Sequence, residues 1–378
     1  MNFDNIKFLV VGAGFFGSVI AERIASQLNK KVLMIDSRDH IGGNSFSYKD
    51  QSTEIEIHKY GSHIFHTSDK EVWDYINQFT KFNSYKHKVK TLSQGQIYDF
   101  PINLNTINHF FNKCLSAQEA PLFLKQQIAT NSFQKNSSFE HKAMEMLGEK
   151  LYRAFIYGYT KKQWGISPRK LPKNIINRVP LRFSTNDKYF NDTYQGIPLQ
   201  GYGKLFDKML NHKNISIKLN TDFFEIKSSI PKDITIIYSG PIDRFFQYKY
   251  GHLKWRTCRF ELEKKDVNLF QNNAVLNFAD EEIAYTRIHE YKHYHPERVQ
   301  STTQTIIAKE FPSDTTSEGN PFYPINTKED QALFKMYLQE AKNEKNTIFG
   351  GRLATYTYLD MHQVINSALS TFKKLSQQ

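Results

Sequence analysis

The chain has 378 residues, more than a single hydrophobic core normally supports, so we expect more than one domain. A composition of 39% hydrophobic and 23% charged residues is that of an ordinary soluble protein. The net charge of +12 favours anionic ligands, but the basic residues form no arm or tail, which argues against nucleic acid as the partner.

The N-terminal residues carry no recognisable targeting signal. Glycines interrupt the apolar run that begins at Phe8, so the run is neither a signal-peptide core nor a membrane span of ~20 apolar residues. We therefore expect a cytoplasmic protein that is not inserted in a membrane. Cys114 and Cys258 form no CxxC pair, so the sequence indicates neither a disulfide framework nor a thiolate metal site.

The N-terminal segment predicts a strand, a glycine turn, a helix and a second strand. Phe8–Val11 is an apolar run typical of a buried parallel strand, and apolar residues at helical spacing follow the glycines. Gly12 permits a tight turn, Gly14 lets a pyrophosphate approach the backbone, and Gly17 lets helix and strand pack closely. The second strand ends at Asp36, where a carboxylate can accept hydrogen bonds from an adenosine ribose. We interpret the unit as a dinucleotide-binding turn, with an ordinary βαβ turn as the alternative.

A second glycine pair, Gly42-Gly43, follows the ribose carboxylate within a few residues. The pair provides another close backbone approach to a long cofactor, which an NAD domain does not need. The segment resembles the second dinucleotide-contact motif of FAD enzymes of the amine-oxidase-like superfamily, and this resemblance favours FAD over NAD. A simple glycine loop between strands is the alternative.

Three histidines, His58, His63 and His66, lie within nine residues. Metal-binding histidines usually lie at i and i+4 on a helix or beside carboxylates, whereas the flanking isoleucines predict short strands that Gly61 interrupts. Strand alternation would place His58 and Tyr60 on one face and direct His63 and His66 to opposite faces. We predict no metal site, and two interpretations remain: hydrogen-bonded core histidines, or a glycine turn that brings His63 close to a flavin.

The middle and later segments predict further elements. Apolar residues at helical period between Ala143 and Phe155 predict a helical lobe, and Ile234–Gly240 predicts another buried strand. The β-forming residues that alternate from Arg256 to Glu310 predict an antiparallel sheet.

Seven short blocks occur in order along essentially the whole chain. They are Gly12–Gly17, His40–Asn44, His58–Thr67, Gly158–Trp164, Tyr194–Pro198, Tyr285–Arg287 and Gly350–Gln363. Together they resemble the bacterial UDP-galactopyranose mutases. One block alone would not identify the family, whereas seven blocks in the same order are a specific match to it.

The resemblance implies an activity and a cofactor. Family members bind FAD and interconvert UDP-galactopyranose and UDP-galactofuranose, the donor of galactofuranose for surface polysaccharides, without net oxidation. In the mechanism proposed for the family, N5 of the reduced flavin forms an adduct with the sugar while UDP leaves and returns. We accordingly expect FAD that is active when reduced, NAD(P)H as external reductant, a UDP-sugar substrate and a homodimer. The alternative is an amine-oxidase-like FAD oxidoreductase, which needs no diphosphate arginines.

The resemblance also implies roles for residues of this chain. Arg178 and Arg287 match the paired arginines that hold the substrate diphosphate, and His63 matches a histidine beside the flavin; these three are the predicted catalytic residues. The predicted cofactor contacts are Gly12, Gly14, Phe15, Phe16, Gly17, Asp36, Ser37, Gly43, Asn44, His58, Gly61, Arg352, Asp360 and Met361. The predicted substrate contacts are Tyr159, Trp164, Arg178, Tyr189, Arg256, Arg287, Tyr323 and Tyr358.

The predicted fold class is α/β, with a discontinuous Rossmann-like FAD-binding domain, a helical lobe and an antiparallel β-sheet lobe. The FAD domain is expected to be discontinuous because the glycine-rich blocks at both ends of the chain must meet on one cofactor. The predicted boundaries are 1–80, 196–245 and 345–378 for the FAD domain, 101–164 for the helical domain, and 81–100, 181–195 and 250–344 for the sheet domain. Residues 165–180 are predicted to form a mobile loop that closes over the substrate, as in the family, with a fixed connector as the alternative.

Overall fold

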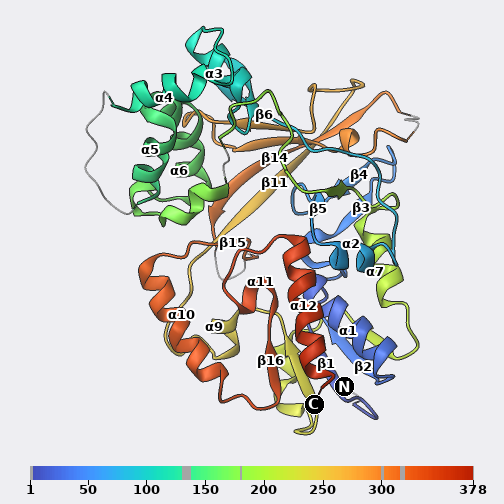
Figure 1. The fold of residues 1–378 in the computed structure, drawn as a ribbon. Helices are drawn as coiled ribbons and strands as arrows, with labels where there is room; N and C mark the ends of the chain where they lie inside the picture. The colour runs from blue at the N-terminus through green and yellow to red at the C-terminus, as the bar shows by residue number, and fades with distance from the viewer. Residues whose placement is uncertain (1–2, 130–137, 179–180, 299–301, 316–319, 378) are drawn as a thin grey trace. The chain divides into compact units, whose positions relative to one another are not determined.

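The computed structural model describes residues 3–129, 138–178, 181–298, 302–315 and 320–377 (Figure 1). The chain divides into two compact units, each assembled from segments that are distant in the sequence. The first comprises Met1–Ser84, Asp192–Leu253 and Glu329–Gln378. The second comprises Tyr85–Asn191 and Lys254–Lys328.

The first unit contains a five-stranded parallel sheet in the order β16-β10-β1-β2-β9. Its strands are β1 Phe8–Val11, β2 Val32–Ile35, β9 Ile215–Lys218, β10 Thr235–Tyr238 and β16 Thr347–Phe349. Leu9, Val10 and Met34 are completely buried, as expected for parallel strands that are covered on both faces. The three predicted strands of this sheet are therefore confirmed, and the third, β10, lies within the predicted segment Ile234–Gly240.

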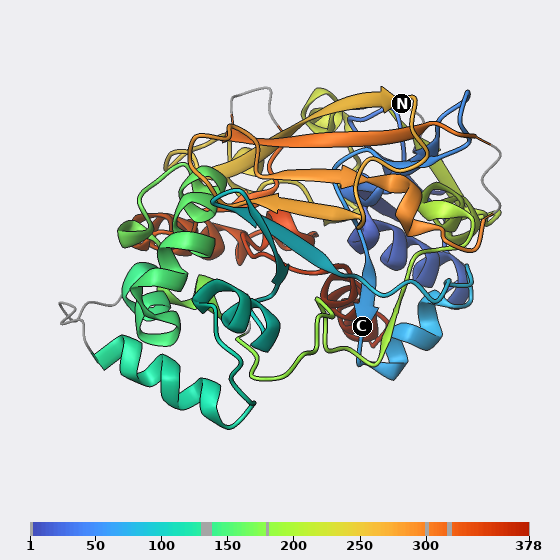
Figure 2. The same ribbon diagram turned by 90° about the horizontal axis from the view of Figure 1, so that it is seen from above.

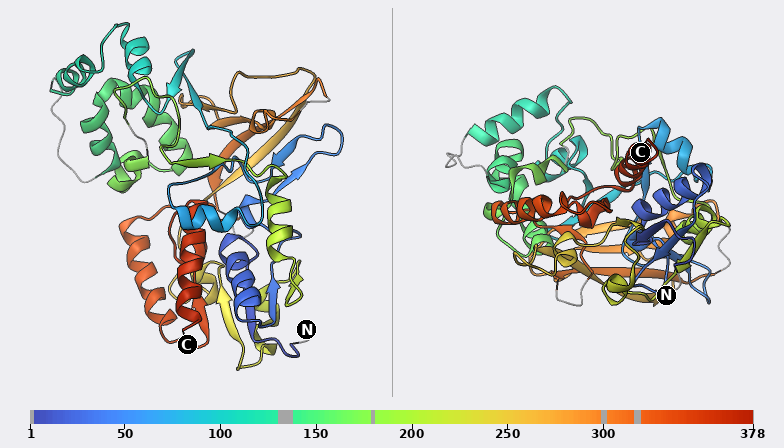
Figure 3. Two further views of the ribbon diagram at one scale, coloured as in Figure 1. Left: turned by 45° about the vertical axis from the view of Figure 1, so that its right-hand side comes forward. Right: turned by 90° about the horizontal axis from the view of Figure 1, so that it is seen from below.

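Helices cover the faces of this sheet, and α1 and α12 lie side by side (Figure 3). At the start of α12, the amide oxygen of Gln363 accepts a hydrogen bond from the N–H of Asp360 at 2.8 Å. In the described part of the chain, no helix is both long and apolar enough to cross a membrane. The helices of the unit are α1 Phe15–Gln27, α2 Lys70–Ile76, α7 Gly201–Leu210, α8 Phe223–Ile226, α9 Ile242–Phe245, α10 Lys328–Ala341, α11 Gly351–Ala354 and α12 Met361–Leu375.

Two short antiparallel pairs complete the first unit. They are β3 Ser47–Lys49 with β4 Glu56–His58, and β5 Phe65–Thr67 with β8 Tyr194–Gly196. The β5–β8 pair joins segments from opposite ends of a long insertion, because the second unit's residues 85–191 lie between them in the sequence. The short 3₁₀ helices of the unit are η1 Gly43–Ser45 and η5 Lys227–Ser229.

The second unit contains a seven-stranded sheet in the order β15-β11-β14-β13-β12-β6-β7. Its strands are β6 Val89–Ser93, β7 Gln96–Phe100, β11 Trp255–Lys265, β12 Val275–Phe278, β13 Arg287–Glu290, β14 Thr305–Asp314 and β15 Tyr323–Pro324. The long strands β11 and β14 pair over their whole length (Figure 2, gold and orange). The predicted antiparallel sheet is confirmed with one difference: β12 and β6 are parallel. A parallel pair needs a long connection, and here the chain between the two strands supplies it.

Helices form the rest of the second unit. They are α3 Leu104–Phe111, α4 Glu119–Ala129, α5 Phe139–Leu151, the π-helix η2 Tyr152–Tyr157, α6 Gly158–Trp164, and the 3₁₀ helices η3 Pro168–Lys170, η4 Lys173–Arg178 and η6 Tyr291–Tyr294. The helical period predicted between Ala143 and Phe155 is present, but Gly148 has a φ of +77° and the last turns are π-helical. The wider π turns keep Ala154 and Phe155 buried beyond the end of α5.

Candidate functional site

The first glycine block forms a tight turn between β1 and α1. Gly12 has a φ of +102°, and a Cβ at this position would lie 2.2 Å from Ser239 Oγ. A Cβ on Gly17 would lie 2.0 Å from the carbonyl oxygen of Gly12. Both positions therefore exclude a side chain for reasons internal to the fold. Gly14 differs, because a Cβ there would meet only Gly43 Cα, at an ordinary contact distance of 3.8 Å.

Gly14 is also the N-cap residue of α1. Among the described residues, no side chain caps this helix end, and no acidic residue occupies its first turn. The helix begins with Phe15 and Phe16, whose backbone N–H groups belong to the first turn and have no partner within the helix. Such an N-terminus next to a glycine is a favourable place for a phosphate group.

Asp36 connects the first glycine block to the second. One of its carboxylate oxygens accepts a hydrogen bond from Ala13 N at 2.7 Å, and the other accepts from Arg38 N at 2.9 Å. The two blocks also meet directly, since Gly42 N donates to Ala13 O at 2.8 Å. The Arg38 guanidinium donates to Asn44 Oδ1 at 2.8 Å, and Ser37, between Asp36 and Arg38, is exposed. Each carboxylate oxygen can accept a second hydrogen bond, so the ribose contact remains a prediction for Asp36.

The C-terminal glycine block packs against the N-terminal one. A Cβ on Gly350 would lie 2.0 Å from the Phe16 ring, so only glycine fits there. The Arg352 guanidinium follows immediately and lies 4.0 Å from the centre of the Tyr358 ring. Asp360 and Met361 then open α12. The structure thus brings these predicted cofactor contacts into the same unit as the first glycine turn.

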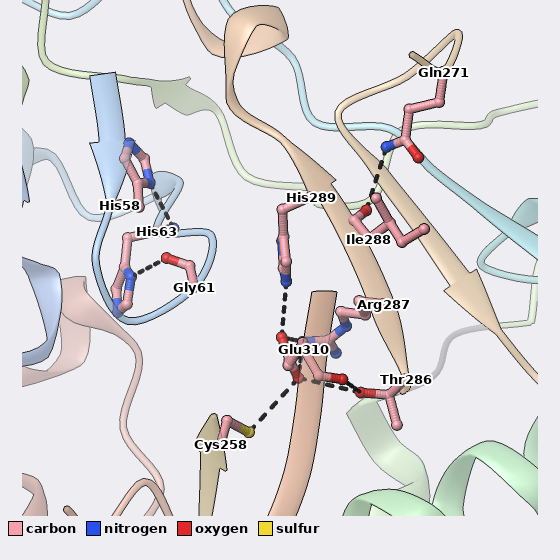
Figure 4. Close-up of polar contacts among 10 residues, drawn as sticks. All are labelled: His58, Gly61, His63, Cys258, Gln271, Thr286, Arg287, Ile288, His289 and Glu310. Atoms are coloured by element: carbon pink, nitrogen blue, oxygen red, sulfur yellow. Dashed lines mark hydrogen bonds and ion pairs between the residues drawn. The ribbon is translucent and has the colours of Figure 1, made fainter. Parts of the chain in front are cut away.

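The histidine block forms a glycine turn closed by hydrogen bonds (Figure 4). Gly61 has a φ of +90°, His63 N donates to His58 Nδ1 at 3.1 Å, and His63 Nδ1 lies 2.8 Å from Gly61 O. Because a carbonyl only accepts, His63 carries its proton on Nδ1, which leaves Nε2 as an acceptor when the ring is neutral. The alternation predicted for Tyr60 is wrong, because β4 ends at His58 and Tyr60 lies in the turn. His66 is hydrogen-bonded elsewhere, through Nδ1 to Asp192 at 2.7 Å.

These observations test whether the first unit fits FAD. Among the described residues, a Cβ on Gly14 would meet only Gly43 Cα, so the backbone at Gly14 is open to a ligand, and this residue begins a helix without a side-chain cap. No group of three or more His, Cys, Asp or Glu side chains is placed to hold a metal ion within the described ranges. The residues fit a dinucleotide with a pyrophosphate at Gly14 and a second approach at Gly43.

The second unit contains a buried cluster around Glu310 (Figure 4). Glu310 Oε2 lies 2.9 Å from His289 Nε2, and both carboxylate oxygens lie 3.4 Å from Arg287 Nη1. Burial alone would raise the pKa of the Glu310 carboxyl, but the Arg287 charge and the hydrogen bond from His289 outweigh it and lower the pKa to about 2. Cys258 and Thr286 complete the surroundings of the carboxylate. Glu310 is therefore ionised and holds Arg287 as a cation.

Arg287 keeps unused donors in this arrangement. Within the described part of the chain, Glu310 is its only hydrogen-bond acceptor, and Nη1 is the only atom engaged, so Nε and Nη2 remain for a ligand. The guanidinium side chain is 27% exposed and lies 5.5 Å from the Tyr159 ring centre. The Tyr159 hydroxyl is buried without a hydrogen-bond partner among the described residues, and burial raises its pKa, so it stays protonated. An anion with two oxygens matches these donors.

Arg256 holds the end of α6. Its guanidinium donates to Gln163 O at 3.0 Å and Lys162 O at 3.1 Å, and it also pairs with Asp314. A Cβ on Gly165 would lie 2.4 Å from Arg256 Nη1, so the glycine makes room for the arginine. The structure therefore gives Arg256 a packing role, and its substrate contact remains a prediction.

The other predicted substrate residues are distributed over several elements. Trp164 ends α6, and the centre of its ring lies 6.4 Å from that of Tyr323 on β15. Tyr189 lies before β8 and packs on His87. Tyr358 belongs to the first unit. The backbone of Arg178 closes η4, but its side chain lies outside the described residues, as do Val179 and Pro180 of the predicted loop.

Comparisons with known proteins place these residues in a family. The family model for UDP-galactopyranose mutase matches residues 154–358, and the model for an NAD(P)-binding Rossmann-like domain matches residues 10–79. A probable UDP-galactopyranose mutase of Klebsiella pneumoniae is 41% identical over 372 residues, which cover 97% of this chain and 94% of that protein. The chain belongs to the UDP-galactopyranose mutase family. The resemblance inferred from the seven blocks is thereby confirmed, and the chain is an enzyme of this family. Its match to a Rossmann-like domain is evidence in favour of a flavin cofactor.

Two further relatives refine the comparison. A dTDP-fucopyranose mutase of Escherichia coli is 38% identical over 369 residues, covering 96% of each chain. A crystal structure of reduced UDP-galactopyranose mutase superposes with a TM-score of 0.76 at 15% identity, covering 99% of this chain and 96% of that one. At this identity the structural match supports the fold alone, and it confirms the predicted α/β class with a parallel and a largely antiparallel sheet.

Three residues near the predicted substrate contacts were not predicted from the sequence. Glu310 and His289 lie on strands β14 and β13, each next to another charged residue, and Lys162 lies inside the matched block Gly158–Trp164. Neither strand gives a clear sequence signal for a buried charge, because charged residues stand beside apolar ones in both. The register that pairs Arg287 with Glu310 comes from the folded sheet.

The depressed pKa of Glu310 predicts a specific acid sensitivity. Its ordinary pKa is 4.5 and its folded pKa is about 2, so the stabilisation is complete above pH 4.5 and is lost as the pH falls towards 2. We expect the free energy of unfolding to fall by about 3 kcal/mol more for the wild type than for Glu310→Gln across this interval. Urea unfolding at several pH values measures the difference, with the exposed Glu261→Gln as control. If the free energy of unfolding falls equally for wild type and Glu310→Gln between pH 4.5 and pH 2, the cluster does not lower the pKa of Glu310.

Proposed function

We propose that this chain is a flavin-dependent mutase that interconverts UDP-galactopyranose and UDP-galactofuranose with no net change of oxidation state. The observation that carries the proposal is the 41% identity to a probable UDP-galactopyranose mutase over nearly the whole length of both chains. The open backbone at Gly14 and the Arg287 cluster of this chain agree with it. An FAD oxidoreductase would not require the Arg287 cluster, because its substrate carries no diphosphate. The predicted homodimer and NAD(P)H as reductant remain parts of the proposal.

Arg287 would bind the diphosphate of the UDP-sugar. Its free Nε and Nη2 donors suit two phosphate oxygens, and the buried Tyr159 hydroxyl lies on the same element as Trp164, which would contact the uridine. Glu310 keeps the guanidinium oriented and is itself too well paired to act as a proton donor. Arg178, Tyr189, Arg256, Tyr323 and Tyr358 are proposed to complete the substrate contacts.

The first unit would hold FAD through the glycine positions Gly12, Gly14, Gly17 and Gly43 and the carboxylate of Asp36. When bound and reduced, the flavin supplies a nucleophilic nitrogen for the anomeric carbon, which no side chain of the chain needs to provide. The turn of His58, Gly61 and His63 would bring the His63 ring to the flavin, and Arg352 and the α12 N-terminus would stabilise negative charge on the flavin ring. Binding of the diphosphate keeps the leaving UDP available for return.

The test is the conversion of UDP-galactofuranose to UDP-galactopyranose by the purified protein, followed by chromatography. The bound flavin is kept oxidised in one sample and reduced with dithionite in the other. We expect turnover in the sample with reduced flavin and none in the sample with oxidised flavin. A flavin-loaded protein without turnover in either state would contradict the proposal, and reduction of its flavin by amines would instead support the oxidoreductase alternative.

A second candidate substrate pair is dTDP-fucopyranose and dTDP-fucofuranose. The observation that favours it is the 38% identity, over 96% of both chains, to a dTDP-fucopyranose mutase. The two donors differ in the base methyl group, the ribose 2′-hydroxyl and the sugar 6-hydroxyl. Each such difference can change kcat/KM by roughly 10- to 200-fold, so parallel assays of both furanose donors decide between them. A higher kcat/KM for the dTDP-sugar would replace the proposed substrate but keep the reaction type.

A further inference from the structure

Lys162 makes an unusual set of contacts in the second unit. Its ammonium group lies within hydrogen-bond distance of four backbone carbonyl oxygens: Phe278 O at 2.9 Å, Asp280 O at 2.7 Å, Ile283 O at 2.9 Å and Tyr285 O at 3.2 Å. An ammonium has three protons, so these acceptors use its whole donor capacity. Burial lowers the pKa of Lys162 to about 8, so the group is still a cation at neutral pH.

The four carbonyls belong to one connection, the residues between the end of β12 and the start of β13. The connection leads directly into Arg287. It also contains three consecutive acidic residues, Asp280, Glu281 and Glu282, whose charges favour a cation at Lys162. Without the ammonium, these four carbonyl oxygens would lose a shared donor, so we expect the connection to be held less firmly.

Lys162 itself lies on α6, between Tyr159 and Trp164. A glycine permits the close contact of this helix with the connection, because a Cβ on Gly158 would lie 2.3 Å from Ala279 O. The helix carries the residues proposed to contact the uridine, and the connection carries the arginine proposed to contact the diphosphate. The ammonium therefore joins the two halves of a single nucleotide-binding surface.

We propose that Lys162 is a positioning residue that sets Arg287 at the correct distance from Tyr159 for a nucleoside diphosphate. The proposal rests on the proposed function, because it requires UDP to be a ligand of these residues. Lys162 does not touch the ligand; it acts through the backbone that carries Arg287. Its removal should therefore weaken the contribution of Arg287 to UDP binding rather than add an independent loss.

The experiment measures the Kd of UDP by titration calorimetry on the full-length, flavin-loaded protein. Four proteins form a cycle: wild type, Lys162→Met, Arg287→Ala and the double variant. We expect Lys162→Met to weaken UDP binding about tenfold, and the double variant to bind UDP no more than about threefold more weakly than Arg287→Ala. A purely structural role would lower the melting temperature but leave the two effects multiplicative.

Controls separate this outcome from misfolding. Lys161→Met removes an exposed lysine that pairs with Glu281 of the same connection at 2.6 Å, and should change the Kd less than twofold. If Lys162→Met does not fold, Gly158→Ala replaces it in the cycle. This variant keeps the Lys162 charge but displaces the connection, and we expect its effect on the Kd of UDP to be non-additive with that of Arg287→Ala in the same way. If the wild type binds UDP but the double variant loses the product of the two single losses of affinity, the inference about Lys162 is wrong and the proposed function stands. A wild type that does not bind UDP would overturn the proposed function and this inference with it.

Discussion

Replacement of Arg287 by alanine is expected to lower kcat/KM for the UDP-sugar by roughly two to three orders of magnitude. The variant loses the two free guanidinium donors that we assign to the diphosphate, and the neighbouring Tyr159 hydroxyl cannot replace their charge. Because binding to the diphosphate is needed in every step that involves UDP, KM should rise and kcat should fall. Steady-state kinetics with reduced flavin measure both constants.

Arg287→Ala also leaves Glu310 with a reduced set of positive partners, so instability is a competing explanation. The double variant Arg287→Ala/Glu310→Gln removes the buried negative charge and should recover most of the lost thermal stability but none of the activity. Arg259→Ala provides the matched arginine control, since that side chain is 59% exposed on β11 and pairs with Glu261. Near-normal kcat/KM in a folded Arg287→Ala protein would exclude the assigned role.

Replacement of Gly14 by valine should produce a folded protein that has lost most of its flavin. A Cβ at Gly14 meets no atom of the described chain closer than Gly43 Cα at 3.8 Å, so the fold can accept it. The added side chain would instead occupy the space in which the cofactor pyrophosphate approaches the N-terminus of α1. We expect the flavin-to-protein ratio after purification to fall roughly tenfold or more. The ratio is measured from the visible flavin absorbance.

Gly17→Ala serves as the comparison, because its methyl group would lie 2.0 Å from Gly12 O and 2.8 Å from Val10. That variant should lose stability as well as flavin, whereas Gly14→Val should melt near the temperature of the flavin-free wild type. A Gly14→Val protein with a full complement of flavin would show that the pyrophosphate does not lie at this glycine.

Local sequence patterns were sufficient for several elements. The strands Phe8–Val11 and Val32–Ile35 follow from apolar runs, which act over a few residues. The seven blocks identified the family for the same reason, because each is a contiguous segment with its own backbone requirement. The helical period up to Phe155 was also recognisable, although the break at Gly148 and the π turns were not.

Contacts between distant segments were not predictable in this way. The parallel pair β12–β6 joins residues almost two hundred positions apart, and its direction depends on the path of the intervening chain. The four acceptors of Lys162 are backbone carbonyls, which every residue has and which therefore leave no sequence signal. The hydrogen bond between His58 and His63 likewise required the turn at Gly61 to be formed.

By itself, the sequence determined the family, the fold class and the glycine positions, because each of these depends on residue types in contiguous segments. The tertiary structure alone decided which charges are paired: Glu310 lies opposite Arg287 because of the register of β13 and β14, and that pairing leaves two guanidinium donors free. The physical reason is that a buried charge is stabilised by its three-dimensional neighbours, and strand register, rather than sequence distance, selects those neighbours.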